Sequence, residues 1–160
     1  MKLAKDSRGW ISVPIILTAA LAAAGNWYIS AAAFMGLLFM IFFHRDPDRL
    51  PQSEGMLSPA DGRIIQATPE KVTVFMGFGD VHVNRSPLDG TIISVEQRKG
   101  THLPAFLNRS CQNQQNRIRI DTEDGEIQLC QITGTFVREI ICYVKPGDHV
   151  LRGERIGMIR

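Results

Sequence analysis

The pentapeptide Ser58-Pro59-Ala60-Asp61-Gly62 recurs twenty-eight positions later with a single change, as Ser86-Pro87-Leu88-Asp89-Gly90. Each copy leads into the same type of β-branched segment, Arg63-Ile64-Ile65 in the first case and Thr91-Ile92-Ile93 in the second. Pro and Gly are typical of tight turns, and Asp tolerates the backbone angles that such turns require. The sequence therefore predicts two similar turns, each followed by a β-strand.

A single histidine lies between the two turns, in the segment Gly79-Asp80-Val81-His82-Val83-Asn84-Arg85. We expect this arrangement to bring Asp61 and His82 onto neighbouring loops. Two interpretations remain open at this level. His82 and Asp61 are a candidate catalytic pair, or else Asp61 and Asp89 cap their turns and His82 is a structural residue. Spacing alone favours the structural alternative.

Composition excludes several classes of function. The 160 residues provide for one domain with a modest core, and 18 Lys and Arg balance 16 Asp and Glu. Without a basic block, nothing indicates binding to nucleic acid. The three cysteines form no CxxC pair and are expected to be reduced. The four histidines lack the spacing of metal ligands, so no metal site is expected.

The N-terminal quarter is strongly apolar, with no charged residue from Gly9 to Phe43. Gly25-Asn26 divides it into two runs, Trp10–Ala24 and Trp27–Phe43. As a helix, the first run would rise roughly 22 Å, less than the bilayer core of about 30 Å. A signal peptide and a buried soluble hairpin are the alternatives. We favour a helical hairpin that anchors the chain in the membrane, either spanning it or dipping into it.

The charges around this hairpin predict its orientation. Lys2, Lys5 and Arg8 precede it, and Arg45 and Arg49 follow it. Basic flanks stay on the cytoplasmic side, so the rest of the chain is expected at the cytoplasmic face of the inner membrane. The predicted organisation is an anchor over residues 1–43, a linker over 44–52 and a β-rich domain over 53–160.

Short strands dominate the predicted domain. They are expected at Arg63–Ala67, Lys71–Met76, His82–Asn84, Gly90–Gln97, Arg117–Thr122, Glu126–Thr133 and Ile140–Val144. A hairpin turn is expected at Asp121–Gly125, and the polar stretch from Leu103 to Asn116 is expected to be an exposed loop with a short helix. The terminal pattern from Gly147 to Gly157 resembles the hairpins of lipoyl and biotinyl carrier domains. The predicted fold is mainly β, a barrel-sandwich-hybrid-like domain preceded by the apolar helical hairpin.

Six motifs taken together are specific for one enzyme family. They are Phe43-His44-Arg45-Asp46-Pro47, Leu57-Ser58-Pro59-Ala60-Asp61-Gly62, Asp80-Val81-His82-Val83-Asn84-Arg85, Leu103-Pro104-Ala105-Phe106, Gln131-Ile132-Thr133-Gly134 and Gly153-Glu154-Arg155-Ile156-Gly157-Met158-Ile159-Arg160. Through them the chain resembles the phosphatidylserine decarboxylase proenzymes of the short, prokaryotic type, over residues 44–160.

The resemblance implies an enzyme that processes itself. Members of the family cut their own chain at a Gly-Ser bond, where the serine attacks the preceding carbonyl. Elimination from the resulting ester leaves a pyruvoyl group on the new N-terminus. This ketone forms a Schiff base with the serine head group of the lipid and draws electrons from the breaking C–C bond. Phosphatidylserine would thus become phosphatidylethanolamine and CO₂.

The resemblance also assigns roles to residues. Asp61 and His82 match the acidic and histidine members of an Asp-His-Ser triad that assists the cleavage. His82 would take the proton of the serine hydroxyl, and Asp61 would orient the His82 ring. Arg85, beside His82, is a candidate anion partner by its charge alone. A solvated surface arginine explains Arg85 equally well.

Three departures from the family pattern are visible. Relatives continue the segment that matches Gly157–Arg160 with Phe-Gly-Ser, whereas no Gly-Ser follows Gly157 here. The sequence is therefore interpreted as the larger β chain, with the cofactor-forming serine expected just after Arg160 on a separate small α chain; an artificial truncation is the alternative. Asn113-Gln114-Gln115 replaces a common Asn-Glu-Arg pattern, and Gly79 stands where longer relatives carry a second histidine.

A function from another class stays open beside the decarboxylase. It is a non-enzymatic, membrane-anchored scaffold of the lipoyl or biotinyl type, although the hairpin tip from His149 to Arg152 offers no lysine for modification. An ordinary serine hydrolase is a further alternative, but the sequence has no GxSxG element for it. For the decarboxylase, the expected partners are a small pyruvoyl-bearing chain, the phospholipid membrane, phosphatidylserine and a second copy of the chain in a homodimer.

Overall fold

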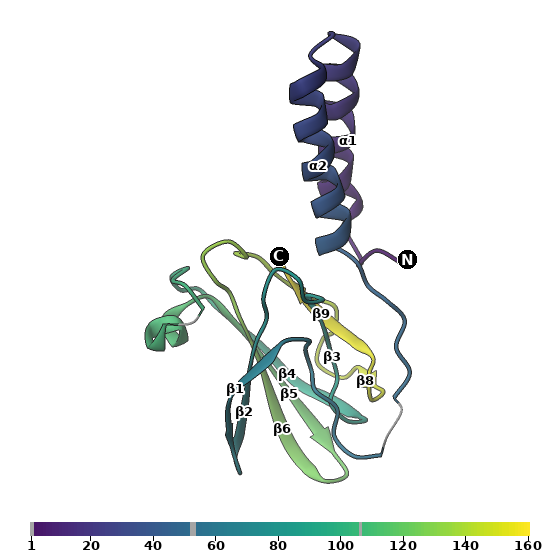
Figure 1. The fold of residues 1–160 in the computed structure, drawn as a ribbon. Coiled ribbons are helices and arrows are strands. Elements are labelled where there is room, and N and C mark those ends of the chain that lie inside the picture. Colours follow the sequence, from purple (N-terminus) through teal and green to yellow (C-terminus); the bar gives the residue numbers. More distant parts are fainter. Residues whose placement is uncertain (1, 52–53, 106) are drawn as a thin grey trace. The chain divides into compact units, whose positions relative to one another are not determined.

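The computed structural model describes residues 2–51, 54–105 and 107–160 (Figure 1). Gln52 and Ser53, at the predicted border between linker and β domain, lie outside the described residues, as does Phe106 of the Leu103–Phe106 motif. The chain divides into two compact units, Met1–Asp48 and Arg49–Arg160. Each unit is described by itself.

Two helices, α1 (Arg8–Ala23) and α2 (Trp27–Phe43), form most of the first unit and contact each other along their length. The chain reverses between them at Gly25, whose φ of 74° is readily adopted only by glycine. The Ser30 hydroxyl donates to the Thr18 carbonyl across the pair (3.0 Å). The helices therefore coincide with the two apolar runs of the sequence.

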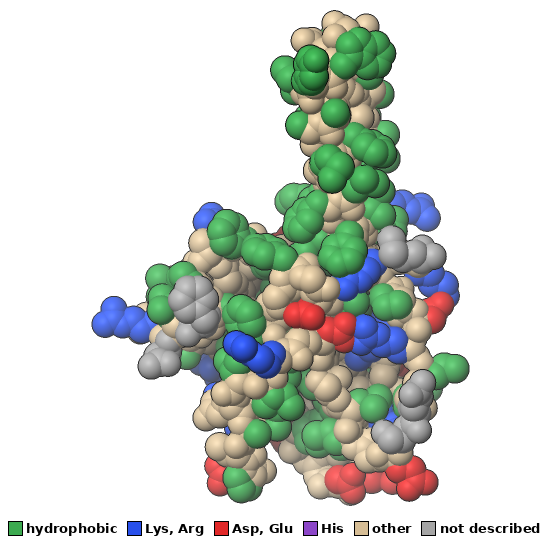
Figure 2. All heavy atoms as spheres, in the orientation of Figure 1, with side chains coloured by type: hydrophobic (Ala, Val, Ile, Leu, Met, Phe, Trp, Pro, Cys, Tyr) green, Lys and Arg blue, Asp and Glu red, His purple; other side chains and the backbone are tan. Residues whose placement is uncertain are grey.

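Large apolar side chains remain on the outside of both helices. Ile16 and Trp27 are 66% and 70% exposed, and Tyr28 is 94% exposed. Figure 2 shows hydrophobic side chains along the outside of the pair. Among the described residues, neither helix combines the length and the apolar character needed to cross a membrane.

The segment before α1 runs antiparallel to the segment after α2 and closes the first unit. The Ala4 N–H donates to the His44 carbonyl, and the Asp46 N–H donates to the Lys2 carbonyl, both over 2.8 Å. The Lys2 ammonium also pairs with the Asp48 carboxylate at 2.7 Å. These contacts join the two ends of the helical unit through backbone bonds.

The described residues of the second unit form nine short strands (Figure 1). They are β1 (Arg63–Thr68), β2 (Lys71–Phe75), β3 (Val83–Arg85), β4 (Gly90–Arg98), β5 (Gln115–Thr122), β6 (Gly125–Ile132), β7 (Ile140–Cys142), β8 (His149–Val150) and β9 (Arg155–Ile159). They form three sheets with the orders β1-β2, β3-β9-β7 and β6-β5-β4-β8. All of these strand pairs are antiparallel.

The core of the second unit lies against the four-stranded sheet. Apolar and polar residues alternate along β5, so every second side chain faces inward. The buried core comprises Ile92, Ile118, Ile120, Leu129, Val150 and Ile156. Because these residues come from five different strands, the C-terminal strands β8 and β9 are as much a part of the core as β4 to β6.

The predicted strands are confirmed, with bounds that differ by up to two residues, and so are the hairpin turn at Asp121–Gly125 and the mainly β character. The expectation of an exposed polar stretch is wrong in part. A 3₁₀ helix is present at Asn108–Gln112, but Asn113, Gln115 and Asn116 are buried. The Asn113 amide bonds the backbone of Leu103 and the Thr133 carbonyl, so its polar atoms have partners inside the protein.

Candidate functional site

The two repeated turns bond to each other reciprocally. The Leu57 N–H donates to the Pro87 carbonyl (3.0 Å), and the Arg85 N–H donates to the Pro59 carbonyl (2.9 Å). The donors Leu57 and Arg85 lie twenty-eight positions apart, and so do the acceptors Pro59 and Pro87. The sequence repeat is therefore also a repeat of contacts, and it holds the loop of Asp61 against the start of the second turn.

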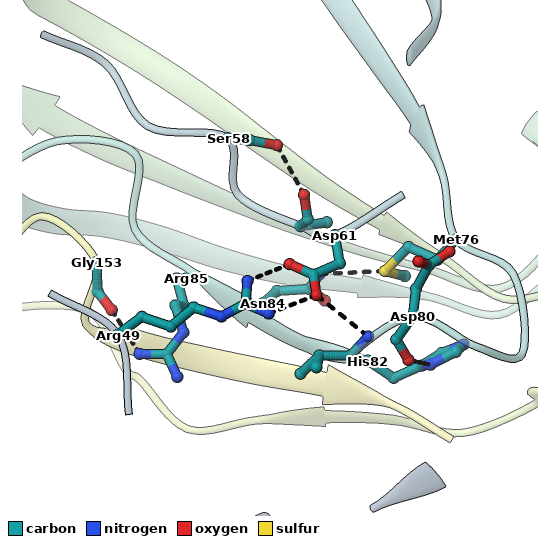
Figure 3. Close-up of polar contacts among 11 residues, drawn as sticks. Arg49, Ser58, Asp61, Met76, Asp80, His82, Asn84, Arg85 and Gly153 are labelled. Carbon is teal, nitrogen blue, oxygen red and sulfur yellow. Dashed lines mark hydrogen bonds and ion pairs between the residues drawn. The ribbon is translucent and has the colours of Figure 1, made fainter. Parts of the chain in front are cut away.

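Asp61 lies in a group of polar contacts at this junction (Figure 3). The Arg49 guanidinium donates to both carboxylate oxygens of Asp61, with a distance of 2.6 Å from Nη2 to Oδ2. The Val81 N–H reaches the same Oδ2 over 3.4 Å. Two-point pairing with a guanidinium holds a carboxylate in a defined orientation. Asp61 is thus held beside the peptide that precedes His82.

His82 is buried and has a defined ring orientation. Its Nδ1 lies 3.0 Å from the Asp80 carbonyl oxygen, and Figure 3 shows the ring turned towards Asp80. Because a carbonyl oxygen can only accept, Nδ1 is the nitrogen that carries the proton in this contact. In the neutral ring, Nε2 then presents a lone pair. In this tautomer Nε2 is the proton-accepting nitrogen.

The structure therefore brings the predicted pair into one cluster through different contacts from those expected. The Asp61 carboxylate contacts the backbone next to His82, while the Asp80 carbonyl contacts the ring. The triad role of Asp61 and His82 stays a prediction. The sequence indicated Arg49 only as a flank of the apolar hairpin, because its pairing with Asp61 depends on a fold that brings together positions twelve residues apart.

The last strand of the chain runs directly beside His82. Strand β9 pairs with β3, with Met158 opposite Val83, and the Ile159 N–H donates to the His82 carbonyl over 3.1 Å. Arg160 exchanges two backbone hydrogen bonds with Glu139 and forms an ion pair with its side chain (2.8 Å). The segment in front of the predicted cleavage site is thus held close to the predicted base.

Arg85 is largely buried and forms part of the protein's own bonding. Its Nη1 donates to the Gly153 carbonyl (2.9 Å), which lies in the turn between β8 and β9. This contact links the strand before the second repeated turn to the turn that connects β8 and β9. The predicted role of Arg85 in substrate binding stays a prediction.

A chain of buried amides, which the sequence did not reveal, crosses between the sheets next to the site. The Gln131 amide donates to Asn84 Oδ1 and accepts from the Asn116 amide, both over 2.8 Å. A Cβ atom at Gly157 would lie 2.6 Å from the Ile141 carbonyl oxygen and 2.8 Å from Gln131 Nε2, so only glycine fits there. Gln131, Asn84 and Gly157 each lie in one of the quoted motifs, whereas Asn116 does not.

Two exposed aromatic rings meet at the edge of this region. Phe78, four residues before His82, contacts Phe136 edge-on with ring centroids 5.5 Å apart. Both side chains are exposed, Phe136 by 79%. Within residues 2–51, 54–105 and 107–160, no three His, Cys, Asp or Glu side chains form a group that could hold a metal ion.

Comparison with known proteins identifies the family. The phosphatidylserine decarboxylase family model matches residues 37–160. Over 167 aligned residues the chain is 38% identical to a putative archaetidylserine decarboxylase proenzyme of Methanococcoides burtonii, covering 99% of the chain and 80% of that relative. It is 39% identical to a phosphatidylserine decarboxylase proenzyme of Streptomyces griseus over 171 residues, covering 100% of the chain and 79% of the relative.

A third relative, a phosphatidylserine decarboxylase proenzyme of Carboxydothermus hydrogenoformans, is 34% identical over 165 residues, covering 94% of the chain and 78% of the relative. These matches define an enzyme of the decarboxylase class. The chain belongs to the phosphatidylserine decarboxylase family. This assignment favours the enzyme over the non-enzymatic scaffold that the sequence left open.

Proposed function

We propose that the chain is the β chain of a pyruvoyl-dependent decarboxylase that cleaves itself at a Gly-Ser bond just beyond Arg160. The observation that carries the proposal is the bond between the Ile159 N–H and the His82 carbonyl. A serine three residues beyond Arg160 is four residues beyond Ile159, so it lies at most about 13 Å from this bond, since an extended residue advances about 3.3 Å. The predicted nucleophile and the predicted base are therefore within reach of one another.

His82 acts in this proposal as the base of the self-cleavage. Its Nδ1–H donates to the Asp80 carbonyl, so Nε2 is the nitrogen that accepts the proton of the serine hydroxyl. Asp61 supports His82 by accepting the Val81 N–H, and Arg49 holds the Asp61 carboxylate for that contact. The ion pair between Arg160 and Glu139 positions the strand that carries the scissile bond.

The pyruvoyl group, carried by the small α chain, supplies a ketone carbonyl that accepts the electrons of the C–C bond broken when CO₂ leaves. The substrate class is a phospholipid with a serine head group. The relatives are named for two such lipids, phosphatidylserine and archaetidylserine, which share that head group. The product is the corresponding ethanolamine phospholipid.

The same proposal includes the barrel-sandwich-hybrid fold and the location of the protein at the inner membrane. Two turn-and-hairpin repeats, and a turn that leads from β8 in one sheet to β9 in another, support a barrel-sandwich-hybrid arrangement. The exposed apolar side chains of α1 and α2, without a charge from Gly9 to Phe43, support an anchor in the inner membrane. The basic residues on both sides of the anchor support a catalytic unit at the cytoplasmic face.

Intact-mass measurement of the native enzyme tests the proposal. The expected result is two chains, one ending just beyond Arg160 and a smaller one whose N-terminus is a pyruvoyl group. Cyanoborohydride added with the serine phospholipid should attach the lipid to the small chain and stop CO₂ release. Decarboxylation by a preparation that contains residues 1–160 alone would refute the proposal, and so would full activity after reductive trapping.

A further inference from the structure

The repeat extends beyond the turns to the hairpins that follow them (Figure 1). In the β1–β2 hairpin Ile64 lies opposite Val74, and in the β4–β5 hairpin Ile92 lies opposite Ile120. Each register shifts at the next residue, between Ile64 and Gln66 in β1 and between Ile92 and Ser94 in β4. Both irregularities fall at equivalent positions of the repeat. The two hairpins are therefore copies with the same internal geometry.

The glycine that ends each turn shows the same equivalence. A Cβ atom at Gly62 would lie 2.2 Å from the Phe75 carbonyl oxygen, and one at Gly90 would lie 2.3 Å from the Asp121 carbonyl oxygen. Each oxygen belongs to the partner strand of its own hairpin. In both copies, the second strand passes directly over the glycine.

The two copies differ in burial, most strongly at Ile64 and Val72 of the first copy, whereas Val74 is partly buried. Ile92, Ile118 and Ile120 of the second copy are buried core residues, with at most 1% of each side chain exposed. The shared register makes Ile64, Val72 and Val74 their counterparts in the first copy. Ile64 is 61% exposed and Val72 is 58% exposed. The first copy thus presents to solvent the apolar face that the second copy buries.

The second copy shows what covers such a face. Strand β8 pairs with the start of β4, placing Val150 opposite Gly90 and burying Val150 in the core. Ile92 also exchanges backbone bonds with this segment, since its N–H donates to the Asp148 carbonyl and its carbonyl accepts from the Gly147 N–H, both over 2.9 Å. In the part of the chain that the structure describes, β1 pairs with β2 alone.

We propose that the β1–β2 hairpin is the docking site of the small pyruvoyl-bearing chain, which adds an extended strand to β1 at Gly62–Ile64 and places an apolar side chain over Ile64. This inference rests on the proposed function, and it names the surface through which the two chains combine. The incoming strand has the place relative to β1 that β8 has relative to β4. It exchanges backbone bonds with Ile64 as Gly147 and Asp148 do with Ile92.

The location of this site explains how docking serves the reaction. Gly62 directly follows Asp61, whose carboxylate is bonded to Arg49 and to the peptide before His82. A strand paired at Gly62–Ile64 therefore runs beside the predicted triad. Docking covers exposed apolar surface and places the small chain next to His82 through the same backbone bonds.

Hydrogen exchange at single-amide resolution tests the inference on the mature wild-type enzyme. The Ile92 amide, which donates to Asp148, is the internal reference. We expect the Ile64 amide to be protected as the Ile92 amide is, because both would donate to an added strand. Intact mass of the same sample reports separately whether a second chain is present, which is the test of the proposed function.

Two neighbouring substitutions form a matched pair for the same test. Ile64→Glu introduces a charge on the proposed contact face, whereas Ile65→Glu introduces the same charge one residue later. The counterpart of Ile65 is Ile93, which remains 41% exposed in the covered copy, so Ile65→Glu is the control. We expect the Ile64→Glu variant to bind at least about tenfold less of the small chain than wild type. The amide of residue 64 should also lose its protection from exchange. Ile65→Glu should match wild type.

The outcomes separate the two proposals. If a pyruvoyl-bearing chain is present but the Ile64 amide exchanges freely, or Ile64→Glu retains that chain fully, the docking site is refuted and the proposed function stands. Protection of Ile64 that depends on protein concentration would identify a second copy of this chain as the occupant and refute the inference. Absence of any second chain from an active enzyme would refute the proposed function and the docking site together.

Discussion

The backbone N–H of Ile159 donates to the carbonyl oxygen of His82 over 3.1 Å, so β9 runs next to the histidine that the sequence singles out. The His82 ring bonds in turn to the Asp80 carbonyl, which leaves Nε2 as the proton acceptor of the neutral ring. The strand in front of the predicted scissile bond and the predicted base are thereby parts of one bonded unit. This relationship leads to the first prediction.

Replacing His82 with Gln in the full-length precursor should slow self-cleavage by about 10²–10⁴-fold, because the proton acceptor for the serine hydroxyl is lost. Cleavage is followed on a gel after synthesis of the precursor. His149→Gln is the matched control, since His149 is exposed on β8. Circular dichroism of both variants verifies folding. Processing of the His82 variant at the wild-type rate would exclude His82 as the base.

The Arg49–Asp61 pair yields a second prediction. Arg49→Met removes both donors to the Asp61 carboxylate. The Arg49 side chain is 45% exposed, so stability should change by less than about 1 kcal/mol. Processing should nevertheless slow by roughly tenfold to a hundredfold, because Asp61 is no longer held against the peptide before His82.

A matched ion pair provides the control for Arg49→Met. Arg119 also donates twice to a carboxylate, that of Glu126, on the β5–β6 hairpin (2.6 and 2.9 Å). Arg119→Met should cost a similarly small amount of stability and leave processing unchanged. Equal processing rates for the two variants would show that the Arg49–Asp61 pair has no specific role in maturation.

The sequence predicted local structure well where local chemistry decides it. Turn residues and β-branched runs located the strands, and the repeated Ser-Pro-x-Asp-Gly motif predicted two similar turns. Burial was less predictable. Ile64 and Ile92 occupy equivalent positions in equivalent motifs, yet one is 61% exposed and the other 1% exposed. The difference depends on β8, a strand more than fifty residues away along the chain.

The polar contacts of the site show the same limit. Asn113 and Asn116 form part of a run that looks solvated, but their amides bond to Thr133 and Gln131 in the interior. Nothing local distinguishes them from exposed amides. Arg49 looked like a basic residue flanking a membrane anchor, and only the fold shows that its guanidinium pairs with Asp61.

A third prediction concerns the glycines that end the two turns. Gly62→Ala and Gly90→Ala should each destabilise the mature enzyme by about 1–3 kcal/mol, because the added methyl group would overlap a carbonyl oxygen of the partner strand. Gly79→Ala is the control, since a Cβ atom there would meet no atom within 4 Å. Chemical denaturation measures the three free energies of unfolding. A loss at Gly79 equal to the loss at Gly62 would contradict the close approach of Phe75.

The fourth prediction concerns the attachment to the membrane. Deleting residues 1–43 from the precursor should remove most of its binding to vesicles of anionic phospholipid, because the exposed apolar side chains of α1 and α2 are lost. Vesicle flotation measures the bound fraction. We expect weaker residual binding, since Phe78, four residues before His82, forms an exposed aromatic pair with Phe136. Adding Phe136→Ser to the deletion should reduce this residual binding further, whereas adding Leu151→Ser, at an exposed apolar residue after β8, should not. Flotation of the deleted protein as strongly as the full-length protein would show that residues 1–43 are not the principal anchor.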